Sequence, residues 1–328
     1  MSDPVATAPG SEFVDPRRCN YSSERPRRLF DHGSSLLITP SVVYLNSTRK
    51  RRLIIIAILL APVCFLGLWA FVIEPARLIV HEKTIAMSAW PAGLNGLRIV
   101  ALSDIHAGSP FIDGDKLKLI VERTNALKPD VIVLLGDYMV RDSWHSTQMP
   151  PEKIAEALKS LQAPLGVYAV LGNHDWWFDL TRVRRAFESG GIRVVDNDVV
   201  RLEKNGNAFW LAGIADAWSH TDDIAGTSKR IPAGEPVIAL THNPDIIQRF
   251  PPTFLLTLAG HTHGGQVNLP FLGRRIVPSE FGQRYAAGHI QEDGKHLFVT
   301  TGIGTSVFPV RFRVPPEIAL LTLTPSGN

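Results

Sequence analysis

The sequence predicts an α/β protein that follows a single membrane-spanning helix. Three observations support this prediction. Residues 53–73 contain no charged side chain. From residue 97 onward, short apolar segments alternate with segments of helical periodicity. After residue 190, strand-like segments follow one another directly. With 45% hydrophobic residues among 328, the chain has enough apolar side chains to build a core.

The first segment, residues 1–52, is rich in Ser, Pro and Arg and shows no periodicity, which predicts a disordered leader. Residues 53–73 are long enough to cross a hydrocarbon layer of about 30 Å as a helix. The alternatives are a buried core helix and the apolar part of a cleaved signal. The length argues against a core helix, and residues 74–77 offer no clear cleavage site. We therefore favour a retained membrane anchor.

Charge sets the predicted orientation of this anchor. The cluster Arg49-Lys50-Arg51-Arg52 precedes the apolar run, and only Arg77 and Lys83 follow it closely. The positive-inside rule then places residues 1–52 in the cytoplasm and the rest of the chain outside. A twin-arginine export signal at Arg51-Arg52 is a weaker alternative. The net charge of +3 does not indicate nucleic-acid binding, and two cysteines exclude a disulfide framework.

Beyond a connector at 74–96, the elements predict a parallel sheet covered by helices. The expected strands are 97–102, 131–135 and 167–171, and the expected helices are 113–128, 151–162 and 179–189. Later strands are expected at 192–195, 199–203, 208–213, 237–241, 254–259, 296–300 and 317–323. A second, mostly β layer on the first sheet accounts for them. We find no internal repeat and no linker that would divide residues 94–328 into separate domains.

Five short motifs carry the chemistry, and each ends or directly follows a strand-like segment. They are Asp104-Ile105-His106, Gly136-Asp137, Gly172-Asn173-His174-Asp175, Thr241-His242-Asn243 and Gly260-His261-Thr262-His263-Gly264-Gly265-Gln266. This placement predicts that their side chains meet at one rim of a sheet. Oxygen and imidazole ligands of this kind suit divalent metal ions.

Strand geometry suggests how each pair would act. Residues i and i+2 of an extended segment point the same way, so Asp104 and His106 are expected to grip one ion together. His261 and His263 are expected to repeat this geometry toward adjacent ions. Asp137 follows the strand at 131–135, where one carboxylate can bridge two metals.

In their order and spacing, the motifs resemble the calcineurin-like metallophosphoesterase superfamily, across essentially all of 97–328. Within this superfamily, the chain resembles the membrane-anchored bacterial phosphodiesterases of the YkuE and YaeI kind. Three segments carry this narrower resemblance: Ile73-Glu74-Pro75, the long motif at 260–266 and Gly302-Ile303-Gly304-Thr305-Ser306. The resemblance implies a four-layer α/β/β/α sandwich. Together with the orientation predicted from charge, it places the catalytic domain on the outer, periplasmic side of the bacterial inner membrane.

The ligand set that the resemblance implies has two parts that share Asp137. One metal would be held by Asp104, His106, Asp137 and His263, and the other by Asp137, Asn173, His242 and His261. The same ligands suit Mn, Fe, Zn, Ni and Co, so the metal identity stays open.

The expected reaction is attack on phosphorus by a hydroxide that bridges the two metals. His174 is the candidate for protonating the leaving alkoxide. Asp175 either orients His174 or caps a helix. Gln266 and Arg284 are candidate phosphate contacts. Residues 176–178 (Trp-Trp-Phe) are candidates for an apolar wall beside the site, with at least one of them in the core.

The leading hypothesis is a membrane-anchored phosphodiesterase, with lipid-linked phosphodiesters as an attractive substrate class. The alternative enzyme is a UDP-2,3-diacylglucosamine pyrophosphatase of lipid A synthesis. That substrate is made in the cytoplasm, so the orientation of the domain separates the two. A non-catalytic tethered binding protein is disfavoured because all seven ligands are present. The natural substrate, the preference for monoesters or diesters, and the oligomeric state stay open.

Overall fold

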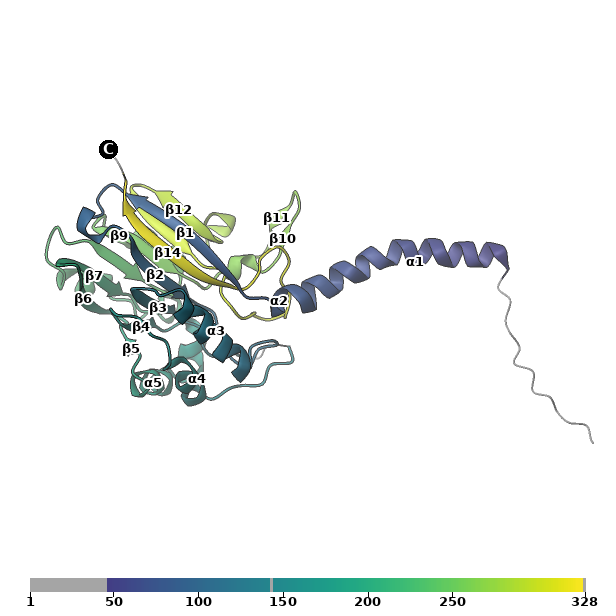
Figure 1. Cartoon of the computed structure of the whole chain (residues 1–328), viewed down its shortest axis with the longest axis horizontal. Coiled ribbons are helices and arrows are strands. Elements are labelled where there is room, and N and C mark those ends of the chain that lie inside the picture. Colours follow the sequence, from purple (N-terminus) through teal and green to yellow (C-terminus); the bar gives the residue numbers. More distant parts are fainter. Residues whose placement is uncertain (1–45, 142–143, 327–328) are drawn as a thin grey trace, which may run out of the picture. The chain divides into compact units, whose positions relative to one another are not determined.

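The computed structural model describes residues 46–141 and 144–326. Most of the predicted leader therefore lies outside the described residues. The chain divides into two compact units, Met1–Leu53 and Ile54–Asn328. Of the first unit, the structure describes only the exposed beginning of helix α1 (Ser47–Leu68). The second unit holds the rest of α1 and both β-sheets (Figure 1).

Helix α1 continues through a π-helical turn, η1 (Trp69–Ile73), into α2 (Glu74–Ala76). The stretch Ser47–Ala76 is long and apolar enough to cross a membrane, and no residue of α1 is buried. This exposure disfavours a core helix. Because the helix begins at Ser47, the basic cluster 49–52 lies in its first turns rather than before it. Insertion in a membrane stays a prediction.

The first sheet has the strand order β1-β14-β2-β3-β4-β5. Its strands are β1 (Ile79–Met87), β14 (Glu317–Pro325), β2 (Leu97–Leu102), β3 (Val131–Leu135), β4 (Val167–Val170) and β5 (Arg193–Val194). Strands β2 to β5 are parallel, and β14 runs antiparallel to β2. Residues 74–96, expected as a connector, thus contain β1. This edge strand exposes much of one face, so it lacks the continuous apolar run that marks the inner strands.

The second sheet has the order β12-β13-β9-β8-β7-β6. Its strands are β12 (Gly288–Glu292), β13 (Lys295–Val299), β9 (Phe254–Ala259), β8 (Val237–Leu240), β7 (Asn207–Gly213) and β6 (Asp198–Lys204). Two of the strands expected after residue 190 do not join it, because β5 and β14 extend the first sheet. A small hairpin, β10 (Asn268–Leu269) and β11 (Gly273–Arg274), stands apart from both sheets.

Successive side chains of a strand point to opposite faces of its sheet, so the apolar residues form three separate core layers. In β2, Leu97 and Ile99 enter the core between the two sheets, whereas Val100 and Leu102 face the helices. Helices α3 (Gly114–Ala126), α4 (Pro151–Leu158) and α5 (Asn173–Ser189) cover that outer face. The outer face of the second sheet contacts short elements such as η4 (Pro244–Arg249) and α6 (Ile224–Lys229).

The four-layer α/β/β/α sandwich is therefore confirmed, with a thin helical layer on its second sheet. The expected helix at 179–189 begins earlier, at Asn173, and has a kink at Asp179, where φ is −174° and ψ is 90°. As a consequence, the third motif forms the first turn of a helix.

Candidate metal centre

The seven predicted ligands lie where strands of both sheets end. Asp104 and His106 follow β2, Asp137 follows β3, Asn173 begins α5 after β4, His242 follows β8, and His261 and His263 follow β9. Each of the seven is at most 5% exposed. The structure thus groups six of them at one buried rim, as the motifs predict, and Asn173 lies at the start of α5 directly before His174.

The local backbone differs from the expected one. The residues Asp104, His106, Asp137, His261 and His263 all have positive φ, between 43° and 70°. The expectation that the two i, i+2 pairs lie in extended segments is therefore wrong. The chain instead turns sharply after each strand, in a region of φ that non-glycine residues rarely adopt. Such turns aim successive side chains inward over a short length of chain.

One group of ligands comprises Asp104, His106 and His263. The ring of His106 donates from Nδ1 to the carbonyl oxygen of Met139 at 2.9 Å, which leaves Nε2 facing the centre. This Nε2 lies 3.1 Å from Nε2 of His263. A carboxylate oxygen of Asp104 lies 3.4 Å from the same atom of His263. A backbone acceptor behind a metal ligand fixes both its tautomer and its orientation.

A second group comprises Asp137, His242 and His261. His242 donates from Nδ1 to the carbonyl oxygen of Leu135 at 2.7 Å. Its Nε2 lies 3.2 Å from Oδ2 of Asp137 and 3.1 Å from Nδ1 of His261. The geometry repeats that of the first group, with one imidazole nitrogen held by backbone and the other turned inward.

Asp137 stands between the two groups. Its Oδ1 accepts a hydrogen bond from the backbone N–H of His174 at 2.8 Å, at the start of α5. Its Oδ2 lies 3.2 Å from Nε2 of His242 and 3.7 Å from Nε2 of His106. One carboxylate oxygen therefore contacts a member of each group, as a bridging ligand must.

Burial and charge shift the titration of these groups. Burial raises the pKa of Asp104 to about 6 and lowers the pKa of His106 to about 4. Burial and the neighbouring His242 together lower the pKa of His261 to about 3. Burial acts to lower the pKa of His242, but the carboxylate of Asp137 beside it has the opposite effect. The pKa of His242 is therefore raised to about 10. Neutral imidazoles are the form that binds metal, and the charge of Asp137 strongly favours a cation beside it.

Several buried polar atoms support a metal-binding role. Among the described residues, Oδ1 of Asn173, Nε2 of His261 and Nδ1 of His263 have no hydrogen-bond partner. Leaving a buried polar atom without a partner costs about 1–3 kcal/mol, so such atoms rarely cluster without a reason. Oxygen and imidazole donors are also the ligands that divalent ions prefer. The residues present therefore fit the two divalent ions expected.

The two predicted catalytic residues lie side by side in the first turn of α5 but contact different groups. His174 has Nε2 at 4.0 Å from Oδ2 of Asp137, and its ring meets that of His106 edge-on. The carboxylate of Asp175 accepts from the backbone N–H groups of Gly172, Asp137, Tyr138 and Met139 at 2.9–3.0 Å. Asp175 thus ties the Asp137 loop to the helix start. The bond to the helix N-cap Gly172 agrees with the capping alternative.

Aromatic rings border the centre on its exposed side. The ring of Trp177 lies 5.1 Å from His174, and the ring of Trp218 lies 4.3 Å from His261. The two tryptophans are 6.4 Å apart and about half exposed. Phe178 instead packs against the core, as expected for at least one of the three consecutive aromatics. No motif predicted Trp218, because it lies in the loop after β7, about 40 residues beyond the aromatic residues 176–178.

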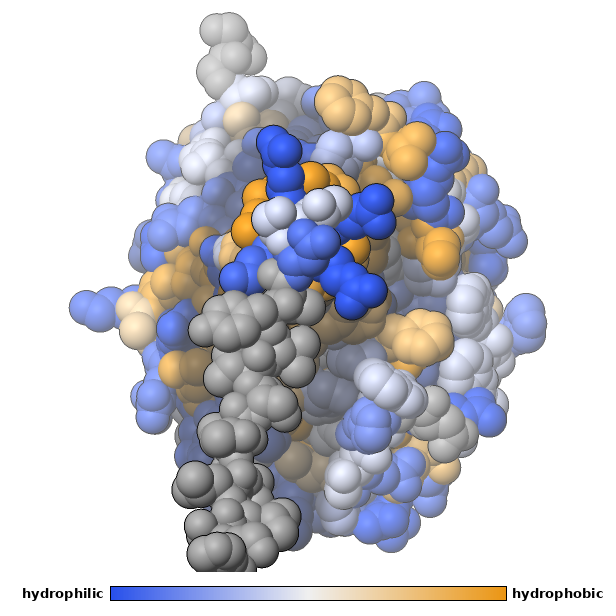
Figure 2. Space-filling view, turned by 90° about the vertical axis from the view of Figure 1, so that its right-hand side faces the viewer, coloured by the Kyte–Doolittle hydropathy of each residue, from blue (hydrophilic) through white to orange (hydrophobic). Residues whose placement is uncertain are grey.

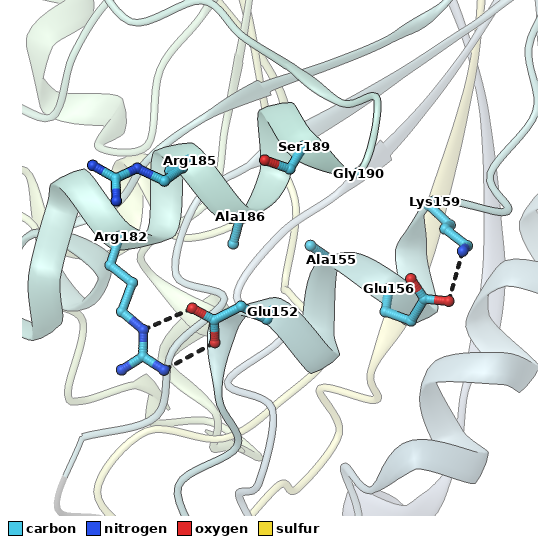
Figure 3. A pocket seen from close by; sticks show the side chains of 9 residues that line it. All are labelled: Glu152, Ala155, Glu156, Lys159, Arg182, Arg185, Ala186, Ser189 and Gly190. Atoms are coloured by element: carbon cyan, nitrogen blue, oxygen red, sulfur yellow. Dashed lines mark hydrogen bonds and ion pairs between the residues drawn. The ribbon is translucent and has the colours of Figure 1, made fainter.

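Two further candidates have other partners. Gln266 accepts from the backbone N–H of Ser306 at 2.8 Å, so it links two loops. Arg284 forms an ion pair with Glu292. A separate groove between α4 and α5 is lined by charged side chains that pair with one another, such as Glu152 with Arg182 (Figure 3). It contains none of the predicted site residues, and we assign it no role in catalysis.

Comparisons with known proteins agree with this geometry. The sequence profile of the calcineurin-like phosphoesterase family matches residues 97–274. The uncharacterized metallophosphoesterase YkuE of Bacillus subtilis is 34% identical over 260 residues, which cover 78% of this chain and 88% of YkuE. Phosphodiesterase YaeI of Escherichia coli is 32% identical over 69% of this chain and 82% of its own.

A third relative is the UDP-2,3-diacylglucosamine pyrophosphatase LpxG of Chlamydia trachomatis. It is 28% identical over 319 residues, which cover 80% of this chain and 94% of LpxG. The family profile matches more than half of this chain, and YkuE is similar over most of both chains. The family profile spans the buried rim described above, from Asp104 to His263. The chain therefore belongs to the calcineurin-like phosphoesterase family and is a hydrolase of phosphoesters.

Proposed function

We propose that this protein is a membrane-anchored phosphodiesterase whose substrates are lipid-linked phosphodiesters. The position of Asp137 carries the proposal, because its Oδ2 lies within 3.7 Å of a ligand atom from each of the two groups. Water adds across the P–O bond, and the products are a phosphomonoester and an alcohol. The name of the relative YaeI, a phosphodiesterase, supports the diester preference.

In this proposal, Asp104, His106, Asp137 and His263 hold one divalent ion, and Asp137, Asn173, His242 and His261 hold the other. Two such ions supply charge neutralisation for the phosphoryl oxygens and a water of lowered pKa. The chain itself positions the ligands through the backbone bonds of His106 and His242. Manganese is one of the metals these ligands suit.

His174 is proposed to give a proton to the leaving oxygen. It lies at the edge of the centre with 15% of its side chain exposed, within 4.0 Å of Asp137. Burial lowers the pKa of His174, so its protonated ring is a stronger acid but a smaller share of the population at neutral pH. Asp175 is proposed as a positioning residue for the Asp137 loop, since both its oxygens are engaged by backbone N–H groups.

We further propose the chain's organisation at the membrane. Residues 1–52 are a cytoplasmic leader and 53–73 the spanning helix. The catalytic domain on the periplasmic side comprises residues 97–328 together with β1 from the segment 74–96. The basic cluster 49–52 and the apolar helix support this orientation. The second candidate function is a UDP-2,3-diacylglucosamine pyrophosphatase, favoured by the similarity to LpxG. An accessibility assay on intact cells distinguishes the two, because that substrate requires a cytoplasmic domain.

The test of the proposed function is hydrolysis of bis-p-nitrophenyl phosphate by the full chain in detergent, with metals added back after chelation. We expect metal-dependent turnover that falls by at least about 100-fold in Asp137→Asn, since a bridging ligand is lost. Glu152→Gln, in the groove between α4 and α5, is the matched control and should keep full activity. Turnover of UDP-2,3-diacylglucosamine alone would select the second candidate. Absence of any metal-dependent turnover by folded protein would reject both.

A further inference from the structure

Large hydrophobic side chains are exposed on two neighbouring loops beside the metal centre. Phe271, Leu272 and Ile276 lie in and after the β10–β11 hairpin, and Val307 and Phe308 lie in a later loop; we call these five residues the apolar loop surface. Phe271 and Ile276 are 107% and 82% exposed. Figure 2 views the protein from the side that carries β10 and β11 in Figure 1, and hydrophobic residues form several patches there among hydrophilic ones.

This exposure is concentrated rather than scattered. Beyond residue 76, the described residues expose other large hydrophobic side chains only at Val80, Leu269 and four tryptophans. Leu269 belongs to the same hairpin. Of the tryptophans, Trp144 is bonded to the later loop through its backbone N–H and the carbonyl oxygen of Val307, at 3.2 Å. A patch of this kind marks a site of interaction with another apolar surface.

Hydrogen bonds join the two loops into one surface. The side chain of Gln266 accepts from Ser306 N–H at 2.8 Å. The N–H of Asn268, at the base of the hairpin, donates to the carbonyl oxygen of Phe312 at 2.9 Å, next to a bridge between Val267 and Phe312. The hairpin and the 306–308 loop are therefore fixed to each other.

The same segment holds the end of the apolar helix. Arg311 donates its backbone N–H to the carbonyl oxygen of Ala70 at 2.8 Å. Val314 donates its backbone N–H to the buried carboxylate of Glu74 at 2.6 Å. Because Arg311 is the third residue after Phe308, their Cα atoms lie at most about 11 Å apart. If the helix spans a bilayer, the apolar loop surface lies at the level where the chain leaves it.

Charge around the loops suits the same partner. Residues 264–279 and 302–316 contain no Asp or Glu, whereas Arg274, Arg275 and Arg313 lie in them. Apolar side chains flanked by arginines are the composition of segments that enter the headgroup region of a membrane with anionic lipids. A bilayer therefore fits this surface better than a second protein does.

We propose that the apolar loop surface inserts into the headgroup region of the bilayer that carries the anchor. This proposal rests on the proposed function, and it deepens that function by stating how substrate is presented. The loops that dock also build the metal centre: Arg274 donates to the carbonyl oxygen of Gly264 at 2.7 Å, and Gly304 N–H donates to that of Asp104 at 2.6 Å. Docking therefore holds the centre at headgroup depth, where the phosphodiester of an amphiphile whose tail stays in the bilayer is presented.

Depth of insertion is the first test. Full-length protein with Cys19→Ser and Cys64→Ser carries one new cysteine, Ile276→Cys, labelled with an environment-sensitive fluorophore and reconstituted in vesicles of phosphatidylcholine and phosphatidylglycerol. We expect a blue shift and strong quenching by lipids that carry a nitroxide near the headgroup. Arg201→Cys, an exposed residue of the edge strand β6, is the matched control and should show neither. Equal and weak quenching at both positions would overturn the proposal.

Activity provides the second test. The double variant Phe271→Ser with Ile276→Ser is assayed on two probes with the same leaving group, soluble bis-p-nitrophenyl phosphate and hexadecyl p-nitrophenyl phosphate embedded in vesicles. We expect at least about a 10-fold loss on the embedded probe and an unchanged rate on the soluble one, because only docking is removed. Unchanged rates on both probes would overturn docking.

Two further outcomes keep the proposals separate. If the wild-type protein does not hydrolyse the soluble probe with any metal, the proposed function is rejected. The quenching experiment would still decide whether the apolar loop surface enters the bilayer. A dimer that the double variant abolishes, with no quenching in vesicles, would assign the surface to a second copy of the chain and overturn membrane docking.

Discussion

The metal-ligand loops and the apolar loop surface are neighbours in the fold, yet they depart from the usual distribution of residues in opposite directions. Asp104, Asp137 and His242 are polar and at most 2% exposed, whereas Phe271 is apolar and fully exposed. The helical layer follows the usual rule, as in the exposed pair of Glu152 and Arg182. Each departure points to a partner outside the chain: divalent ions for the buried polar groups, and a bilayer for the exposed apolar ones.

Asp175 sharpens the comparison, because it is a buried carboxylate whose partners all lie within the chain. Replacing it in Asp175→Ala leaves four backbone N–H groups of the Asp137 loop and helix start without their acceptor. We expect a loss of about 3–5 kcal/mol in the free energy of unfolding, measured by urea titration in detergent. Asp175→Asn keeps one acceptor oxygen and should lose less. Full stability together with full activity in Asp175→Ala would contradict the positioning role.

His174 tests whether the edge of the centre acts on the leaving group. In His174→Gln we expect about a 100-fold loss of kcat on a diester with an alkyl leaving group. The loss on p-nitrophenyl esters should be much smaller, since that leaving group departs without a proton. Metal content, measured on the same protein, should be unchanged. An equal loss with both leaving groups would indicate that His174 acts through the geometry of the centre instead.

The smallest effect is expected for the pair of His81 and Glu317. Glu317 is a buried carboxylate whose hydrogen-bond partners all lie within the chain. It accepts from His81, from the hydroxyl of Thr300 and from Thr301 N–H, each at 2.9 Å. Burial raises the pKa of Glu317, but these hydrogen bonds hold it below its ordinary value of 4.5. The hydrogen bond that His81 donates to Glu317 raises the pKa of His81 above 6.5.

The pH dependence of stability follows from these two shifts. The contribution of His81 is fully present below pH 6.5 and is lost as pH rises through its folded pKa. That of Glu317 is present above pH 4.5 and is lost as pH falls through its folded pKa. His81→Gln should therefore lower Tm by about 1–3 °C between pH 4.5 and 6.5 and by less at about pH 9. A decrease that is the same at both pH values would contradict the ion pair.

The comparison also shows how far sequence alone can reach. Strands such as β2, β3 and β9 were predictable because they are buried on both faces and form continuous apolar runs. The meeting of the candidate ligands at one rim was predictable because their motifs end or follow strand-like segments. Their division into two sets came from the resemblance of those motifs to the family. In contrast, β1 is an edge strand in which exposed and buried positions are mixed. It has no continuous apolar run that would identify it as a strand.

Other parts of the site depend on tertiary structure. The positive φ of Asp104 and His106 is set by loops that turn after β2, which spacing in the sequence does not report. Trp218 reaches His261 across the rim from the loop after β7. Phe271 and Ile276 are apolar residues like many others in the chain, and only the folded structure shows that they face outward.

The central claim is that the buried polar rim binds two divalent ions that share Asp137. The most direct test is the metal content of the full chain in detergent, stripped by a chelator and then equilibrated with Mn, Fe, Zn, Co or Ni and dialysed. We expect two ions per chain with at least one of these metals, and fewer in Asp137→Asn. A folded wild-type protein that retains no more than one ion per chain with every metal would contradict it.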